Sequence, residues 1–159
     1  MINTLQFREL VVRPALIYIG HHSLDAENLV LGTAIVESKL TYLKQLGGGP
    51  ALGLFQMEPR THDDIWENYL AREDNLTRRL FDLISDVQEG NRPQEMVWNL
   101  WYAAAMCRVF YLRIAEPLPN SVEGHASYWK RYYNTSYGKG KASQFVDAWN
   151  DALRIRAVS

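Results

Sequence analysis

Glu37 is the side chain whose surroundings in the sequence most favour acid–base chemistry. It follows the apolar run Ala34–Val36, at the C-terminal end of a predicted helix. Burial among apolar groups disfavours the charged form of a carboxyl group and raises its pKa, which suits a general acid. A helix-end glutamate that simply faces water is the alternative, and the helix alone does not exclude it, because most glutamates are solvated.

A second group of residues follows Glu37 and Ser38 after a variable stretch. It consists of the run Gly53–Gln56, then Glu58, and then Pro59 and Thr61. Gln56 lies 19 positions after Glu37, and no Asp or Glu intervenes. A glycine beside a catalytic loop most often permits close approach of the backbone to a ligand, so we expect Gly53 to face the substrate.

These elements resemble the signature of soluble lytic transglycosylases, which are related to goose-type lysozymes within the lysozyme superfamily. In that family a Glu-Ser pair is followed by Gly-Leu-Met-Gln and by Pro-x-Thr; the corresponding residues here are Glu37 with Ser38, Gly53–Gln56, and Pro59 with Thr61. The resemblance implies that Glu37 lies at the floor of a sugar-binding cleft. It also implies that Ser38, Gly53, Phe55 and Gln56 bind the substrate.

The resemblance continues near the C-terminus. Family members have a late Tyr-Asn motif whose tyrosine hydroxyl points towards the catalytic glutamate, and Tyr133 and Asn134 are the best matches here. The usual Ala-Gly after the motif is replaced by Thr135 and a delayed Gly138. The flanking segments 111–119 and 128–135 are similar to those of bacteriophage-encoded transglycosylase-like proteins.

The function implied by this resemblance is cleavage of the β-1,4 bond between N-acetylmuramic acid and N-acetylglucosamine in peptidoglycan. A lytic transglycosylase needs only Glu37, as acid and then as base on the muramic acid 6-hydroxyl, whereas a hydrolytic lysozyme needs a second carboxylate. The absence of an acidic residue between Glu37 and Gln56 favours transglycosylation. Goose-type lysozymes carry an acidic residue at the place of Glu58, so hydrolysis by Glu37 with Glu58 stays open as the alternative. A third alternative is a phage structural protein that kept the fold and lost activity.

The fold expected is mainly helical, of the α+β lysozyme-like kind, in a single catalytic domain that spans residues 1–159. Apolar periodicity and helix caps predict five helices, of which the one at 93–115 is apolar on nearly every side and is expected to be the central, buried helix. The glycines and prolines of 47–59 predict an irregular loop or short β-hairpin over the cleft. The predicted helices cover residues 23–38, 74–89, 93–115, 124–133 and 142–156.

Composition limits the classes of function. The chain has 159 residues, 47% hydrophobic and 22% charged, and these values are typical of one globular domain. The formal net charge of −1 argues against nucleic acid as a partner, although aromatic and basic residues alternate along 129–141. The single cysteine, Cys107, predicts a small core residue rather than a nucleophile.

No metal or cofactor is expected. The four histidines, with Asp25, Asp63 and Asp64, show no ligand spacing such as HExxH, so we interpret them as surface residues. The Gly47–Gly49 run fits no phosphate-binding pattern and predicts a turn.

Neither stable membrane insertion nor a secretory signal is expected. Charged residues interrupt the apolar run 93–115, and Arg8, Glu9 and Arg13 interrupt the N-terminal one. A cell-wall substrate would then be reached from the host cytoplasm with the help of a holin, or from a virion with other virion proteins.

Overall fold

The computed structural model describes residues 1–85, 92–135 and 138–154. In this part of the chain the secondary structure is almost entirely helical, so the expected mainly helical class is confirmed. The α-helices are α1 (Thr4–Phe7), α2 (Arg13–Tyr18), α3 (Leu24–Ser38), α4 (Pro59–Asp64), α5 (Asp74–Leu83), α6 (Glu95–Trp98), α7 (Leu100–Leu112), α8 (Val122–Tyr128) and α9 (Ala142–Arg154). Shorter helical turns are η1 (Arg8–Val12), η2 (Ile65–Tyr69), η3 (Leu70–Arg72), η4 (Arg92–Gln94) and η5 (Trp129–Asn134).

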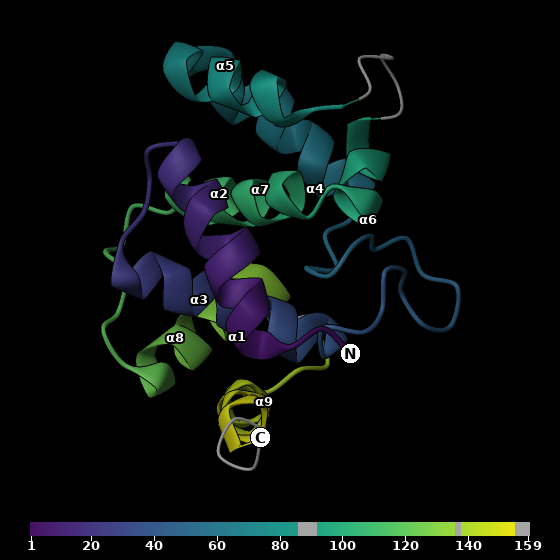
Figure 1. Ribbon diagram of the computed structural model, residues 1–159, viewed down its shortest axis with the longest axis vertical. Helices are drawn as coiled ribbons and strands as arrows, with labels where there is room; N and C mark the ends of the chain where they lie inside the picture. The colour runs from purple at the N-terminus through teal and green to yellow at the C-terminus, as the bar shows by residue number, and fades with distance from the viewer. Residues whose placement is uncertain (86–91, 136–137, 155–159) are drawn as a thin grey trace.

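Two buried helices, α3 and α7, form the centre of the molecule (Figure 1). Helix α7 packs against α2, α3, α5 and α6, while α3 also packs against α8 and α9. The Thr33 and Tyr111 hydroxyls join the two helices through a buried hydrogen bond of 2.8 Å. The central helix expected from the sequence therefore shares its place with α3, which carries Glu37.

The prediction of a single helix over 93–115 is wrong, because Asn99 separates α6 from α7. Asn99 adopts an extended backbone, and its side chain accepts a hydrogen bond from the Tyr102 N–H at 3.0 Å. Its amide group donates to the Leu83 carbonyl at 2.7 Å and to Glu95 Oε1 at 2.8 Å. Asparagine is a favoured N-cap because such local hydrogen bonds compete with a continuous helix.

The helix expected over 74–89 ends earlier, at Leu83. Ile84 is extended, and the buried Glu95 accepts hydrogen bonds from both the backbone and the hydroxyl of Ser85. The rest of that expectation, residues 86–91, lies outside the described residues, as do the last two residues of the predicted C-terminal helix.

The segment between α3 and α4 contains no regular strand pair. Its β-structure consists of two isolated antiparallel bridges, one joining Lys44 and Leu52 and the other joining Leu52 and Met57. A tight turn from Gly53 to Gln56 closes the second bridge, and both end residues have positive φ angles, +70° and +48°. The loop nonetheless has a buried interior, since Leu52, Leu54, Phe55 and Met57 belong to the core.

No helix in the described part of the chain combines the length and the apolar character needed to cross a bilayer.

Candidate active site

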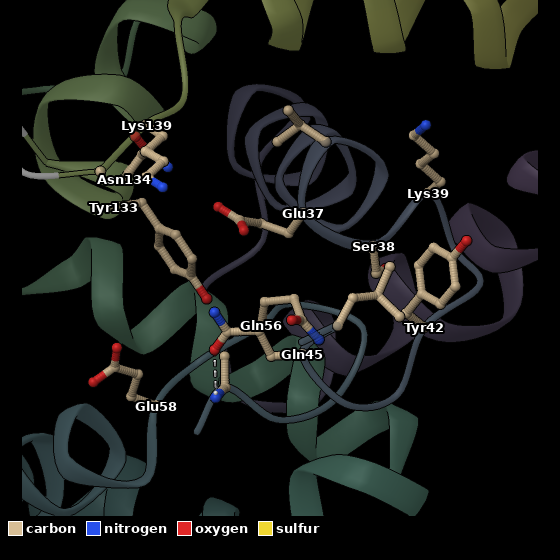
Figure 2. Close-up of a pocket in the computed structure, with 14 residues that line it drawn as sticks. Glu37, Ser38, Lys39, Tyr42, Gln45, Gln56, Glu58, Tyr133, Asn134 and Lys139 are labelled. Atoms are coloured by element: carbon tan, nitrogen blue, oxygen red, sulfur yellow. Dashed lines mark hydrogen bonds between the residues drawn. The ribbon is translucent and has the colours of Figure 1, made fainter. Parts of the chain in front are cut away.

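An open hollow of about 740 Å³ lies beside the C-terminal end of α3. Its walls come from three regions that are distant in sequence: the end of α3, the loop that follows it, and the segment around η5 (Figure 2). The hollow brings together six residues singled out by the sequence: Glu37, Ser38, Gln56, Glu58, Tyr133 and Asn134. Val36, Lys39, Tyr42, Gln45, Leu46, Ala51, Gly138 and Lys139 complete the lining.

A smaller hollow of about 390 Å³ borders Glu37 on the side of α9. The two hollows share Val36, Glu37, Lys39 and Asn134, while Gln144, Asp147 and Asp151 of α9 line the smaller one alone. Glu37 therefore lies where the two hollows meet and borders both of them.

The Glu37 side chain is partly buried, and within the described residues it accepts one hydrogen bond, from the Trp129 indole N–H at 2.9 Å from Oε1. Burial raises the pKa of its carboxyl group from 4.5 to about 7, because few groups replace the lost water; the indole hydrogen bond lowers the pKa and offsets part of this effect. A pKa near 7 lets the Glu37 carboxyl group keep a proton close to neutral pH, as a general acid requires.

Glu58 has a different environment on the same hollow. Its side chain is 46% exposed and lies 3.8 Å from the guanidinium of Arg60. Figure 2 shows Glu58 on the far side of the hollow from Glu37, with Tyr133 and Gln56 between them. Glu58 could therefore act as a second carboxylate on the same hollow. Its side chain is more exposed to water than that of Glu37.

Two of the predicted substrate-binding residues, Ser38 and Phe55, are buried and contact other parts of the fold. Ser38 is 1% exposed, and its hydroxyl donates to the Ala34 carbonyl at 3.0 Å. Phe55 is 2% exposed, lies outside the linings of both hollows, and contacts Phe7 with ring centroids 6.2 Å apart. The expectation that the Phe55 ring binds sugar is therefore not met by the geometry.

The expectation for Gly53 is also corrected. A Cβ atom added at Gly53 would lie 2.2 Å from the Met96 carbonyl oxygen, so the open side of this glycine faces α6 and not the hollow. The close approach that requires glycine is between two parts of the backbone. Gln56, three positions after Gly53, does line the hollow, and its side-chain amide donates to the Gly53 carbonyl at 2.9 Å.

Tyr133 reaches the hollow, but its hydroxyl is committed elsewhere. It donates to the Phe55 carbonyl at 2.7 Å instead of to Glu37, and burial raises its pKa well above 10. Asn134 Oδ1 accepts from the Lys130 ammonium at 2.7 Å, which also donates to the Thr135 and Gly138 carbonyls. The Tyr-Asn motif thus fixes the loop beside Glu37.

Sequence reasoning missed the direct partner of Glu37, Trp129. A signal was present, because Trp129 lies four positions before Tyr133, and residues at this spacing share one face of a helix. It also missed the loop residues Tyr42, Gln45 and Leu46, which have no motif of their own.

The histidines correct another expectation. His62 and His125 are buried, at 0% and 2% exposure, not on the surface. His62 Nε2 lies 2.7 Å from the Tyr102 hydroxyl, and His125 Nε2 lies 2.8 Å from the Pro119 carbonyl oxygen. Among the described residues, no group of three or more His, Cys, Asp or Glu side chains is placed to hold a metal ion. Cys107 is fully buried in the core.

Comparisons with protein-family models, curated proteins and solved structures find no match to this chain. Its functional interpretation therefore depends on the geometry of the two hollows and on the short motifs that border them.

Proposed function

We propose that the protein is a peptidoglycan-cleaving glycosidase of the lysozyme-like kind, with Glu37 as its catalytic acid. The observation that carries the proposal is a carboxyl group at the junction of two hollows that has no ion-pair partner among the described residues and has a pKa of about 7. A pKa near the working pH gives a general acid both a sufficient protonated fraction and enough acidity. The motif resemblance names the substrate, the β-1,4 bond between N-acetylmuramic acid and N-acetylglucosamine.

The lining of the larger hollow supports a carbohydrate substrate. Polar groups are provided by Gln45, Gln56 and Asn134, and two partly exposed apolar side chains, Tyr42 and Leu46, lie among them. Sugars present hydroxyl groups at their edges and C–H groups on their faces, so they pair with such mixed surfaces. The irregular loop that carries Tyr42 and Leu46 takes the place of the hairpin expected over the cleft.

The reaction favoured here is transglycosylation. Glu37 donates its proton to the leaving glycosidic oxygen, and the resulting carboxylate then accepts the proton of the muramic acid 6-hydroxyl as that oxygen attacks the anomeric carbon. The proton count balances, and the product is a 1,6-anhydro sugar. A single group with a pKa near 7 suits both steps, because neither its acid nor its base form is strongly favoured.

Hydrolysis with Glu58 as the second carboxylate is the alternative, and it is favoured by the place of Glu58 on the same hollow. An inverting mechanism requires roughly 6.5–9.5 Å between the two carboxyl groups, so that a water molecule fits between them. Glu58→Gln is then expected to stop hydrolysis, whereas under transglycosylation it leaves most of the activity and the anhydro products.

The test of the proposal is digestion of purified cell-wall sacculi by the protein and by Glu37→Gln. The variant keeps the size and hydrogen-bonding shape of the side chain but has no proton to donate, so activity should fall at least about a hundredfold. Glu67→Gln, at an exposed position outside both hollows, is the matched control. Near-normal lysis by Glu37→Gln would refute the assignment of Glu37 as the catalytic acid. Absence of lysis by the parent protein itself would favour a structural protein without activity.

Mass spectrometry of the released fragments separates the two reactions, because an anhydro product is one water lighter than a hydrolysed one. The setting proposed for the activity is a bacteriophage protein that acts on the host wall, either from the virion or after passage through a holin pore.

A further inference from the structure

Two lysines border the candidate active site, and the reaction proposed above gives them no role. Lys39 follows the last turn of α3 and lines both hollows, and Lys139 lines the larger one. Both side chains are exposed, and Figure 2 shows them on opposite sides of Glu37. Any polymer that reaches Glu37 must therefore pass close to positive charge.

The backbone at Lys39 adds an independent observation. Lys39 has φ of +52° and ψ of +29°, the left-handed conformation, at the C-cap of α3. Glycine is the usual residue at such a helix end, because a side chain is strained there. The capping hydrogen bond, from the Lys39 N–H to the Ile35 carbonyl, involves only the backbone, so the cap itself does not require a lysine. Strain of this kind is found most often at functional sites.

Within the described residues, no carboxylate forms an ion pair with Lys39 or Lys139. Two acidic side chains that line the hollows lie near arginines instead: Glu58 lies 3.8 Å from Arg60, and Asp151 lies 3.8 Å from Arg154. Glu37 accepts its hydrogen bond from the Trp129 indole. Asp147 lines only the smaller hollow. The larger hollow therefore has two cationic groups available for a ligand, although the whole chain has a net charge of −1.

We propose that Lys39 and Lys139 bind carboxylate groups of the substrate and so select acidic glycan strands over neutral N-acetylglucosamine polymers. An ammonium group acts as a flexible point charge that can meet a carboxylate without a fixed geometry. Peptidoglycan has two kinds of carboxylate: the lactyl carboxylate of a muramic acid that carries no peptide, and the carboxylates of the attached peptides. The inference rests on the proposed function and specifies the substrate of that site.

The test is binding by the Glu37→Gln variant, which cannot turn over its ligands, measured by titration calorimetry at low salt. Three tetrasaccharides of equal backbone length are compared: the neutral N-acetylglucosamine tetramer, the alternating muramic acid tetramer with free lactyl carboxylates, and the same tetramer with peptides attached. At least one acidic ligand should bind about tenfold more tightly than the neutral one, and added salt should reduce the difference.

Adding Lys39→Gln and Lys139→Gln together should abolish this preference, so that the acidic tetramers bind no more tightly than the neutral one. If the loss is confined to the peptide-free ligand, the lysines read the lactyl group; if it is confined to the peptide-bearing one, they read the peptide. The matched control is Lys44→Gln with Lys141→Gln, which removes the same charge at exposed positions outside both hollows and should keep the preference.

Lys39→Gly distinguishes this role from a structural one. Glycine relieves the left-handed strain, so the midpoint of thermal unfolding should rise by about 2–4 °C while the preference for the acidic ligand weakens. An equal affinity of Glu37→Gln for acidic and neutral tetramers, or a preference that survives loss of both lysines, would overturn the inference and leave the proposed function standing. Failure of Glu37→Gln to bind any of the three glycans would overturn both.

Discussion

The two glutamates of α3, the buried Glu27 in its first turn and the partly buried Glu37 in its last, have opposite acid–base properties. Glu27 is 1% exposed and is bound by Arg13 at 3.0 Å and by His22 at 2.7 Å, with Arg8 at 3.5 Å. Burial alone would raise its pKa, but the hydrogen bonds of Arg13 and His22 and the charges of Arg13 and Arg8 together lower it. Glu37 has no cation within ion-pair distance in the described residues, and burial raises its pKa to about 7.

The helix contributes to this contrast in the same direction. The N-terminal end of a helix stabilises negative charge, whereas the C-terminal end disfavours it. One residue type on one helix thus provides a permanent anion that ties the N-terminal segment to α3 and a titratable acid that faces the hollow. The contrast distinguishes residues that stabilise the fold from residues that take part in chemistry. The predictions that follow test to which of these two groups a residue belongs.

The largest effect is expected at Gly53, which we place with the fold. Gly53→Ala forces a side chain into the left-handed conformation and against the Met96 carbonyl oxygen, so it should lower the free energy of unfolding by about 3 kcal/mol. Gly48→Ala is the matched control, because Gly48 has φ of +84° and open space around it; about 1 kcal/mol is expected there. Urea denaturation measures both. Equal losses in the two variants would show that the contact with α6 is unimportant.

A slightly smaller loss is expected from Glu27→Gln. Removing the buried anion leaves two arginines near an uncharged amide, and because these arginines are partly exposed, the free energy of unfolding should fall by about 2 kcal/mol. Glycan cleavage per folded molecule should stay unchanged, since Glu27 lines neither hollow. A variant with unchanged stability and reduced turnover would show that Glu27 takes part in the reaction.

Glu37→Gln is expected to change stability in the opposite sense. The folded-state pKa of Glu37 is raised, so its contribution to stability is full below pH 4.5 and is lost as the pH rises through about 7. The variant has no group to ionise there and should exceed the parent in free energy of unfolding by about 3 kcal/mol at pH 8, but not at pH 4. Parallel pH profiles for variant and parent would contradict the raised pKa.

The smallest predicted effect concerns Trp129. Its indole N–H stabilises the Glu37 carboxylate, so Trp129→Phe should raise the pKa of Glu37 further, by up to about one unit. The alkaline limb of the pH–activity profile, where Glu37 loses its proton, should move upward by the same amount. Carbon NMR of Glu37 gives the pKa directly, and circular dichroism checks the fold. An unchanged or lowered limb would mean that Trp129 only fills space.

Local signals were enough for the helices with clear caps and periodicity. The predicted helix over 23–38 matches α3, whose N-cap Ser23 accepts from the Ala26 N–H as its residue type predicts. The failures, at Asn99 and after Leu83, both depend on Glu95 and on contacts between elements that are distant in sequence. Periodicity describes one segment at a time and cannot include such contacts.

The sequence by itself determined the helical class and the residue types of the site: an acid after an apolar run, a glycine-dependent turn and a late Tyr-Asn pair. Only the tertiary structure decided how these residues are used. It placed Glu37 against the Trp129 indole, 92 positions away in sequence, and turned Gly53 towards α6. It also directed the Tyr133 hydroxyl to the Phe55 carbonyl. A pKa or a close approach depends on which groups surround an atom, and for these residues the surrounding groups come from remote parts of the chain.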